Sequence, residues 1–134
     1  MHKVIVTDYL APPPDCEQKE LSGLATVHCL QARNNAELHG KLGDAHALIA
    51  YHDITLPAHV LAELEECRII VRCGVGFDSV DIQAAGAMGI PVCNVPDYGV
   101  DEVADHAIGL MLACSRGLVR VERTVRFSLA PWRA

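Results

Sequence analysis

The sequence predicts a parallel α/β fold in which five strands alternate with helices. Short apolar runs recur along residues 1–98, and each is followed by a break and a segment with helical caps or spacing. No hairpin signal interrupts this alternation. The order is typical of a parallel sheet with helices on both faces, in a flavodoxin-like or half-Rossmann arrangement.

The expected strands are apolar runs bounded by turns or caps. Arg68–Arg72 is the clearest, because it is almost entirely apolar between its arginines, as in a strand buried on both faces. The other strands are expected at Val4–Val6, Ala25–Leu30, Ala45–Tyr51 and Ile90–Val95. Ligands of such sheets bind at the carboxyl ends of the strands. The groups placed there are Asp8-Tyr9, Tyr51-His52-Asp53, Arg72–Gly76 and Asn94–Tyr98.

Helices are expected between the strands, at residues 15–24, 36–42, 55–66 and 78–88. Asp15, Asn34 and Thr55 are the expected N-caps, because a short polar side chain accepts a hydrogen bond from the first turn. Gly43 and Gly89 are expected to end the second and fourth of these helices.

Residues Val100–Phe127 predict a single long crossover helix that differs in kind from the others. Its apolar residues cover much of its girth, so it needs neighbours on most sides. Left bare, this surface predicts that the chain self-associates or aggregates. Four arginines near its end predict a solvated face with a Glu122–Arg126 pair, and a phosphate-binding stripe is the alternative. They are Arg116, Arg120, Arg123 and Arg126.

Composition excludes several classes of protein. The 134 residues are 51% hydrophobic and 21% charged, which indicates an ordered globular chain. The net charge of -6, with acids and bases intermixed, argues against a nucleic-acid partner. No membrane segment or signal peptide is evident, so a soluble, cytoplasmic protein is expected. The six cysteines form no C-x-x-C pair, and free buried thiols without a metal are expected.

The segment Arg72–Asp81 predicts an anion-binding corner. Gly74 and Gly76 follow an apolar strand and precede a helix, so bare backbone N–H groups and Arg72 can face an anion. A dinucleotide fingerprint is disfavoured, because Ser79 replaces its third glycine and three strands precede the loop. A carboxylate or phosphate site and a simple turn that needs glycine for positive φ both stay open.

The chain resembles the D-isomer-specific 2-hydroxyacid dehydrogenases in several linked motifs. They are C-R-I-I-V-R-C-G-V-G-F-D-S-V-D-I from Cys67, A-A-G-A-M-G-I-P-V-C-N-V-P from Ala84, and V-D-E-V-A-D-H-A from Val100. Within that family it is most similar to the C-terminal-binding-protein branch, which Tyr51–Leu56 also supports. The match covers nearly the whole chain, most strongly residues 44–118.

The resemblance implies a role for each segment and for several residues. Residues 1–98 would be the first part of a split substrate-binding domain, and residues 99–134 would begin the NAD-binding domain. The implied substrate-binding residues are Arg72 beside the substrate carboxylate, the loop amides of Gly74, Val75 and Gly76, and His52 at the same cleft. Val103 would line the cofactor side, where some relatives carry threonine.

The implied activity is hydride transfer between NAD(H) and a small 2-oxo or 2-hydroxy acid, by a homodimer when complete. The family's catalytic Arg, Glu and His and its Rossmann motif would lie beyond Ala134, so no residue here is assigned as catalytic. The chain alone is therefore expected to be inactive. The alternative function is a corepressor-like peptide-binding module that uses the Val27–Ala50 region.

Overall fold

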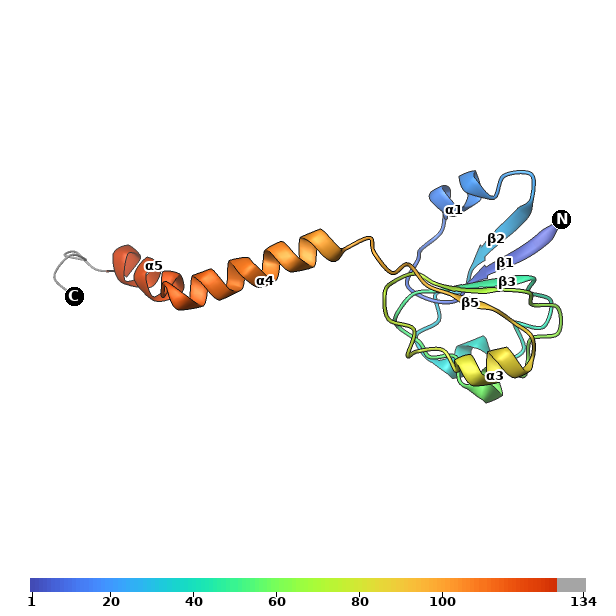
Figure 1. Cartoon of the computed structure of the whole chain (residues 1–134). Helices are drawn as coiled ribbons and strands as arrows, with labels where there is room; N and C mark the ends of the chain where they lie inside the picture. The colour runs from blue at the N-terminus through green and yellow to red at the C-terminus, as the bar shows by residue number, and fades with distance from the viewer. Residues whose placement is uncertain (128–134) are drawn as a thin grey trace. The chain divides into compact units, whose positions relative to one another are not determined.

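A computed structural model of the chain describes residues 1–127. The chain divides into two units, Met1–Pro96 and the segment from Asp97 onward (Figure 1). The first unit contains every strand that the described residues form, and the second contains two helices.

The first unit is a five-stranded, all-parallel sheet with the strand order β2-β1-β3-β4-β5. The strands are β1 (His2–Val6), β2 (Ala25–Cys29), β3 (Ala47–Ala50), β4 (Ile70–Arg72) and β5 (Val92–Cys93). This is the flavodoxin-like order, so the predicted fold class is confirmed. The order changes direction between β1 and β3, which makes their carboxyl ends the switch point where such sheets bind ligands.

The connecting helices are shorter than predicted. They are α1 (Asp15–Glu20), the 3₁₀-helix η1 (Asn35–Leu38), α2 (Ala58–Leu61) and α3 (Ile82–Ala87). Helix α1 lies on one side of the sheet and α3 lies on the other (Figure 1), and α2 packs against α3.

Two of the predicted N-caps are wrong. Pro14 and Pro57 occupy the cap positions of α1 and α2, and neither helix has a side-chain cap. Proline presets a backbone φ that suits a helix start, so these helices begin without a capping side chain. Asp15 instead lies in the first turn of α1, where its negative charge suits the helix N-terminus.

The helix predicted at residues 36–42 is a single 3₁₀ turn. Its cap is as predicted, since the Asn34 side chain accepts a hydrogen bond from the Glu37 N–H at 3.3 Å. It stops early because the Glu63 carboxylate accepts the Gly40 N–H at 2.7 Å and contacts His39 Nδ1 at 2.7 Å. These long-range contacts replace the helical hydrogen bonds that the sequence pattern predicted.

The larger part of the core lies on one face of the sheet. Ile5, Leu48 and Ile70 occupy adjacent register positions on β1, β3 and β4 and are at most 1% exposed. The helices and their flanking loops cover this face with further buried apolar residues. They include Leu38, Leu42, Leu56, Leu61, Val80, Ala85 and Ile90. Their burial makes the first unit a folded body and holds the strand ends in place.

The single helix predicted over residues 100–127 is wrong, because the second unit contains two helices, α4 (Val100–Ser115) and α5 (Leu118–Phe127). Gly117 separates them with a φ of 61°, a left-handed conformation that continues no right-handed helix. The Gly117 N–H donates to the Cys114 carbonyl at 3.1 Å and closes α4. The predicted pair is present, since Arg126 Nε donates to Glu122 Oε1 at 2.6 Å.

No helix among the described residues is long and apolar enough to cross a membrane. All six cysteines are free, but Cys16, Cys93 and Cys114 are exposed, so the prediction of buried thiols holds only in part. Burial raises the pKa of the partly buried thiols of Cys29, Cys67 and Cys73, which makes them weak nucleophiles. Within residues 1–127, no group of three or more metal-ligating side chains comes together.

The structure predicts that stability falls in acid. The hydrogen bond from Lys3 Nζ lowers the pKa of Asp44, and the contact with His39 lowers that of Glu63. A carboxyl with a lowered folded-state pKa stabilises fully above its unfolded pKa, about 4, and loses that contribution as pH falls through its folded value. We therefore expect the urea midpoint to decrease below about pH 4.

The matched variants for this test are Lys3→Met and Lys19→Met. Lys3→Met removes the partner of Asp44 and should flatten the acid part of the curve, whereas Lys19 is exposed on α1 and should have no effect. Equal pH profiles for Lys3→Met and the unmodified chain, measured by urea unfolding, would contradict the assignment.

Candidate functional site

The carboxyl ends of β1, β3 and β4 lie side by side at one edge of the sheet. Val6 pairs with Ile49, and Ala50 pairs with Arg72. The hydrogen bonds continue past the strands, because the Thr7 N–H donates to the Ile49 carbonyl at 2.9 Å and the Cys73 N–H donates to the Ala50 carbonyl at 2.8 Å. The segments that follow the three strands therefore start as neighbours, as the parallel-sheet prediction required.

Asp8 anchors this edge from inside the protein. Its side chain is fully buried, and its Oδ1 accepts hydrogen bonds from the Tyr51 N–H at 2.9 Å and the Thr7 hydroxyl at 2.8 Å. Its Oδ2 accepts the Asp53 N–H at 2.7 Å. The carboxylate thus fixes the backbone of the loop after β3, which carries His52. Asp8 therefore has a structural role at this edge.

The aromatic rings of Tyr9, Tyr51 and His52 lie close together at this edge of the sheet. The Tyr9 ring lies 4.7 Å from the His52 ring and 5.3 Å from the Tyr51 ring, measured between centroids. The Tyr51 hydroxyl donates to Glu17 Oε1 at 3.0 Å. Burial and this bond raise the pKa of Tyr51, so its hydroxyl stays protonated at neutral pH. His52 is exposed, and its Nε2 lies 3.8 Å from Asp53 Oδ1.

Arg72 ends β4 and is half-buried. Its Nη1 donates to the Cys73 carbonyl at 3.2 Å, while its buried Nε has no hydrogen-bond partner. Among residues 1–127, the ion pairs within 4.0 Å do not include Arg72, so Arg72 forms no ion pair with the nearby Asp78. The guanidinium charge is therefore not neutralised by any described carboxylate in direct contact, and a donor is left without an acceptor.

Gly74, in the loop after Arg72, has no room for a side chain because the Arg72 guanidinium lies against it. A Cβ on Gly74 would lie 1.5 Å from Arg72 Nη1, so the guanidinium occupies the space of a side chain at that position. Neither Gly74 nor Gly76 has a positive φ, so the interpretation as a turn that needs glycine for φ is wrong.

The backbone N–H groups of this loop are not equivalent. The Gly74 N–H already donates to the Arg72 carbonyl at 2.9 Å. The Val75 and Gly76 N–H groups donate to no acceptor within the described part of the chain. Asn94, after β5, donates its Nδ2 to the Val75 carbonyl at 2.7 Å and fixes the direction of this peptide. Two amides, rather than the predicted three, are thus available to an anion.

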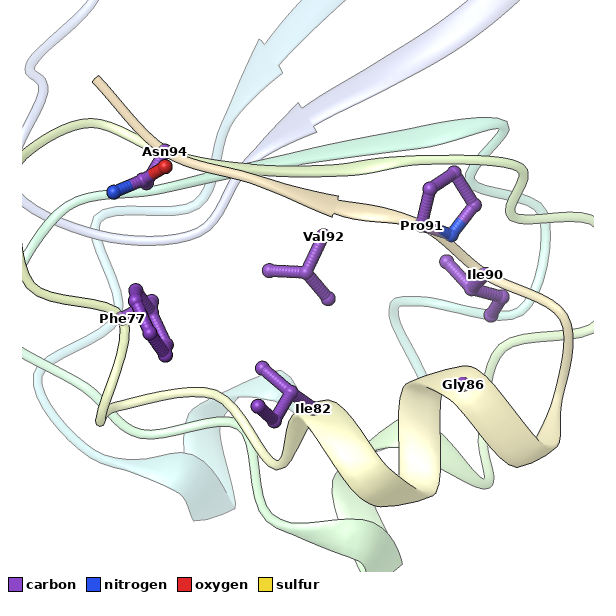
Figure 2. A pocket seen from close by; sticks show the side chains of 7 residues that line it. All are labelled: Phe77, Ile82, Gly86, Ile90, Pro91, Val92 and Asn94. Atoms are coloured by element: carbon purple, nitrogen blue, oxygen red, sulfur yellow. The ribbon is translucent and has the colours of Figure 1, made fainter. Parts of the chain in front are cut away.

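An apolar hollow of about 370 Å³ lies next to this loop, between α3 and β5. Figure 2 shows Phe77, Ile82 and Val92 pointing into it, with Asn94 at the loop end. No lining residue carries an ionisable side chain. The hollow therefore offers apolar contact but no group for acid, base or nucleophilic chemistry.

The described residues do not fit the pyrophosphate of NAD. The loop carries Ser79 at the third position of the dinucleotide fingerprint, where glycine or alanine allows close packing of the helix on the strand. The helix that follows, α3, starts only at Ile82. Val103 lies on α4, 70% exposed, and its apolar side chain offers no polar contact.

Sequence reasoning placed Tyr9 and Asn94 at the carboxyl edge but did not name them as site residues. Their neighbours come from distant segments, which no local pattern reports. A signal for Tyr9 did exist, since a residue directly after a buried strand at the switch point is at a position where ligands bind.

Comparison with known proteins identifies the chain. The family model for the D-isomer specific 2-hydroxyacid dehydrogenase catalytic domain matches residues 4–128. The D-3-phosphoglycerate dehydrogenase of Mycobacterium bovis is 32% identical over 123 residues, which are 92% of this chain and 23% of that protein. The chain thus spans about a quarter of the length of this curated relative.

Solved structures share the fold of this chain. An NADPH-dependent glyoxylate/hydroxypyruvate reductase from Sinorhizobium meliloti, in complex with citrate, is 28% identical with a TM-score of 0.76, over 93% of this chain and 38% of that one. A D-lactate dehydrogenase from Aquifex aeolicus, complexed with NAD and lactic acid, has a TM-score of 0.79 at 24% identity, over 93% and 38% of the two chains. This chain belongs to the D-isomer-specific 2-hydroxyacid dehydrogenase family, whose members are oxidoreductases.

Proposed function

We propose that this chain is the substrate-anchoring part of an oxidoreductase that transfers a hydride between NAD(H) and a small 2-hydroxy or 2-oxo acid. The observation that carries the proposal is the Arg72 guanidinium beside two free amides, at the carboxyl edge of a sheet of this family. Charge-assisted hydrogen bonds from such donors hold a carboxylate with defined geometry. Residues 1–98 form the substrate-domain part of this proposal, and residues from 99 onward lead into the cofactor domain.

The division of work among the residues follows from their chemistry. Arg72 supplies the positive charge, and the Val75 and Gly76 N–H groups orient the carboxylate oxygens. Gly74 leaves room for the guanidinium, and Asn94 holds the Val75 peptide in place. His52 lies on the neighbouring loop, where it faces the rest of the bound acid. Val103 is the residue of this chain proposed on the cofactor side.

The remaining parts of the proposal concern the whole protein. NAD supplies the hydride chemistry when bound, and the general acid and base come from residues outside this chain. A homodimer in the cytoplasm is the proposed form, since the exposed apolar residues of α4, such as Ile108, Met111 and Leu112, suit a covered surface. Placement in the C-terminal-binding-protein branch is supported by the motifs at Tyr51 and Arg72.

A peptide-binding module is the second candidate. One observation favours it, a hollow of about 420 Å³ that lies largely in the Val27–Ala50 region predicted for peptide contact. His28, Leu30 and Lys41 line it together with Lys3 and Ile5 of β1, so it lies at the β1 and β2 end of the sheet and not at the Arg72 loop. A short peptide with an apolar side chain fits a hollow of this kind.

NMR titrations of the chain separate the carboxylate anchor from the peptide-binding module. We expect pyruvate, added to the ¹⁵N-labelled chain, to shift the Val75 and Gly76 amide signals saturably, whereas neutral pyruvamide shifts neither. A peptide library should instead perturb the signals of Leu30 and Lys41 if the second candidate holds. Unchanged Val75 and Gly76 signals with pyruvate would refute the carboxylate anchor. The chain alone should not oxidise NADH with any 2-oxo acid.

A further inference from the structure

Tyr9 is held in a backbone conformation that residues with a side chain avoid. Its φ is 61°, and the Leu10 N–H donates to the Asp8 carbonyl across it at 2.6 Å, so Tyr9 is the centre of a γ-turn. Turns of this kind with positive φ are rare and unfavourable. The turn persists because Asp8, directly before it, is buried and fixed by its contacts with the loop after β3.

The turn places an aromatic ring at the ligand-binding edge of the sheet. One side of the Tyr9 ring packs on His52, with an interplanar angle of 49°, while Tyr9 as a whole remains 61% exposed. Glycine would adopt this turn without strain but would present no ring. A strained aromatic residue at a ligand-binding edge therefore points to a use for the ring itself.

The carboxylates near Tyr51 and His52 restrict the kind of substrate group that can contact the Tyr9 ring. Tyr51 donates to the carboxylate of Glu17, and His52 lies beside the carboxylate of Asp53. A phosphate or second carboxylate on a bound acid would meet these negative charges. An apolar or aromatic substituent would stack on the ring face at no such cost.

We propose that Tyr9 is a specificity-determining residue, whose ring, together with His52, favours 2-oxo acids that end in an apolar or aromatic group. The proposal rests on the proposed function, because the carboxylate must be held at Arg72 for the other end of the acid to reach Tyr9. It predicts that this chain disfavours a substrate that carries a phosphate, such as the one in the name of the mycobacterial relative.

The test compares pyruvate, phenylpyruvate and 3-phosphohydroxypyruvate in NMR titrations of the chain. We expect phenylpyruvate to bind about tenfold more tightly than 3-phosphohydroxypyruvate, with the largest ring-proton shifts at Tyr9 and His52. Tyr9→Gly should keep the affinity for pyruvate and lose the preference for phenylpyruvate. Its melting temperature should be equal or higher, because glycine adopts the positive φ freely.

Two more variants separate the ring from the backbone. Tyr9→Phe keeps the ring and should keep the preference, whereas Tyr9→Asn tolerates positive φ without a ring and should lose it. If pyruvate binds but the unmodified chain and Tyr9→Gly discriminate equally, the role of Tyr9 is overturned and the carboxylate anchor stands. If no acid binds the unmodified chain, both proposals fail together.

Discussion

Arg72→Met is expected to weaken pyruvate binding by about 10- to 100-fold, because it removes the charged donor of the proposed anchor. A hydrogen bond to a charged group contributes about 1.5–3 kcal/mol, and each 1.4 kcal/mol is about tenfold in affinity. Methionine retains much of the apolar stem and removes a buried Nε that has no partner, so the fold should persist. The measurement is the amide titration at Val75 and Gly76.

Gly74→Ala provides a second test of the same anchor without removing the charge. The new Cβ would occupy the position of Arg72 Nη1 and displace the flexible guanidinium, which should weaken pyruvate binding. Gly86→Ala is the matched control, since nothing lies within 4 Å of a Cβ there and alanine favours the helix by up to about 1 kcal/mol. Unchanged pyruvate affinity in both Arg72→Met and Gly74→Ala would exclude Arg72 as the anchor.

Asp8→Ala should produce the largest loss of stability of any substitution at this edge, about 2–5 kcal/mol. It leaves the Tyr51 and Asp53 N–H groups without their acceptor, and each buried donor left unsatisfied costs about 1–3 kcal/mol. Urea unfolding measures the free energy, provided that the slope of the transition is unchanged.

The matched control for Asp8→Ala is Asp53→Ala. Asp53 follows β3 and lies at the same edge of the sheet as Asp8, which follows β1. The Asp53 side chain is 46% exposed, and its ion-pair partner among the described residues is the exposed His52 ring, so its loss should change stability by less than about 0.5 kcal/mol. Equal destabilisation by the two substitutions would show that Asp8 does not anchor the loop. Asp8→Ala should also broaden the Tyr9 ring signals, because the γ-turn loses its support.

The sheet and its topology were predictable because they depend on strong local patterns. Runs such as Arg68–Arg72 are apolar over their whole interior, and their alternation with helix signals restricts the connections to parallel crossovers. Helix lengths were not predictable in the same way. The turn at Asn35–Leu38 ends where Glu63, distant in sequence, takes up its hydrogen-bonding groups, and α4 ends at a glycine inside an apolar pattern.

The candidate site was likewise predictable in part from the sequence. The sequence alone determined the family, the strand ends that form the binding edge, and the Arg72 loop, because each is a contiguous motif with a chemical meaning. The tertiary structure was needed to show that Gly74 makes room for a guanidinium, that Asp8 holds the loop after β3, and that the Tyr9 ring packs at a tilt against His52. The Asp8 and Tyr9 contacts join strand ends that are close in the sheet but far apart in the chain, and no local pattern encodes them. The Gly74 contact is local, but it depends on the direction that the Arg72 side chain takes in the fold.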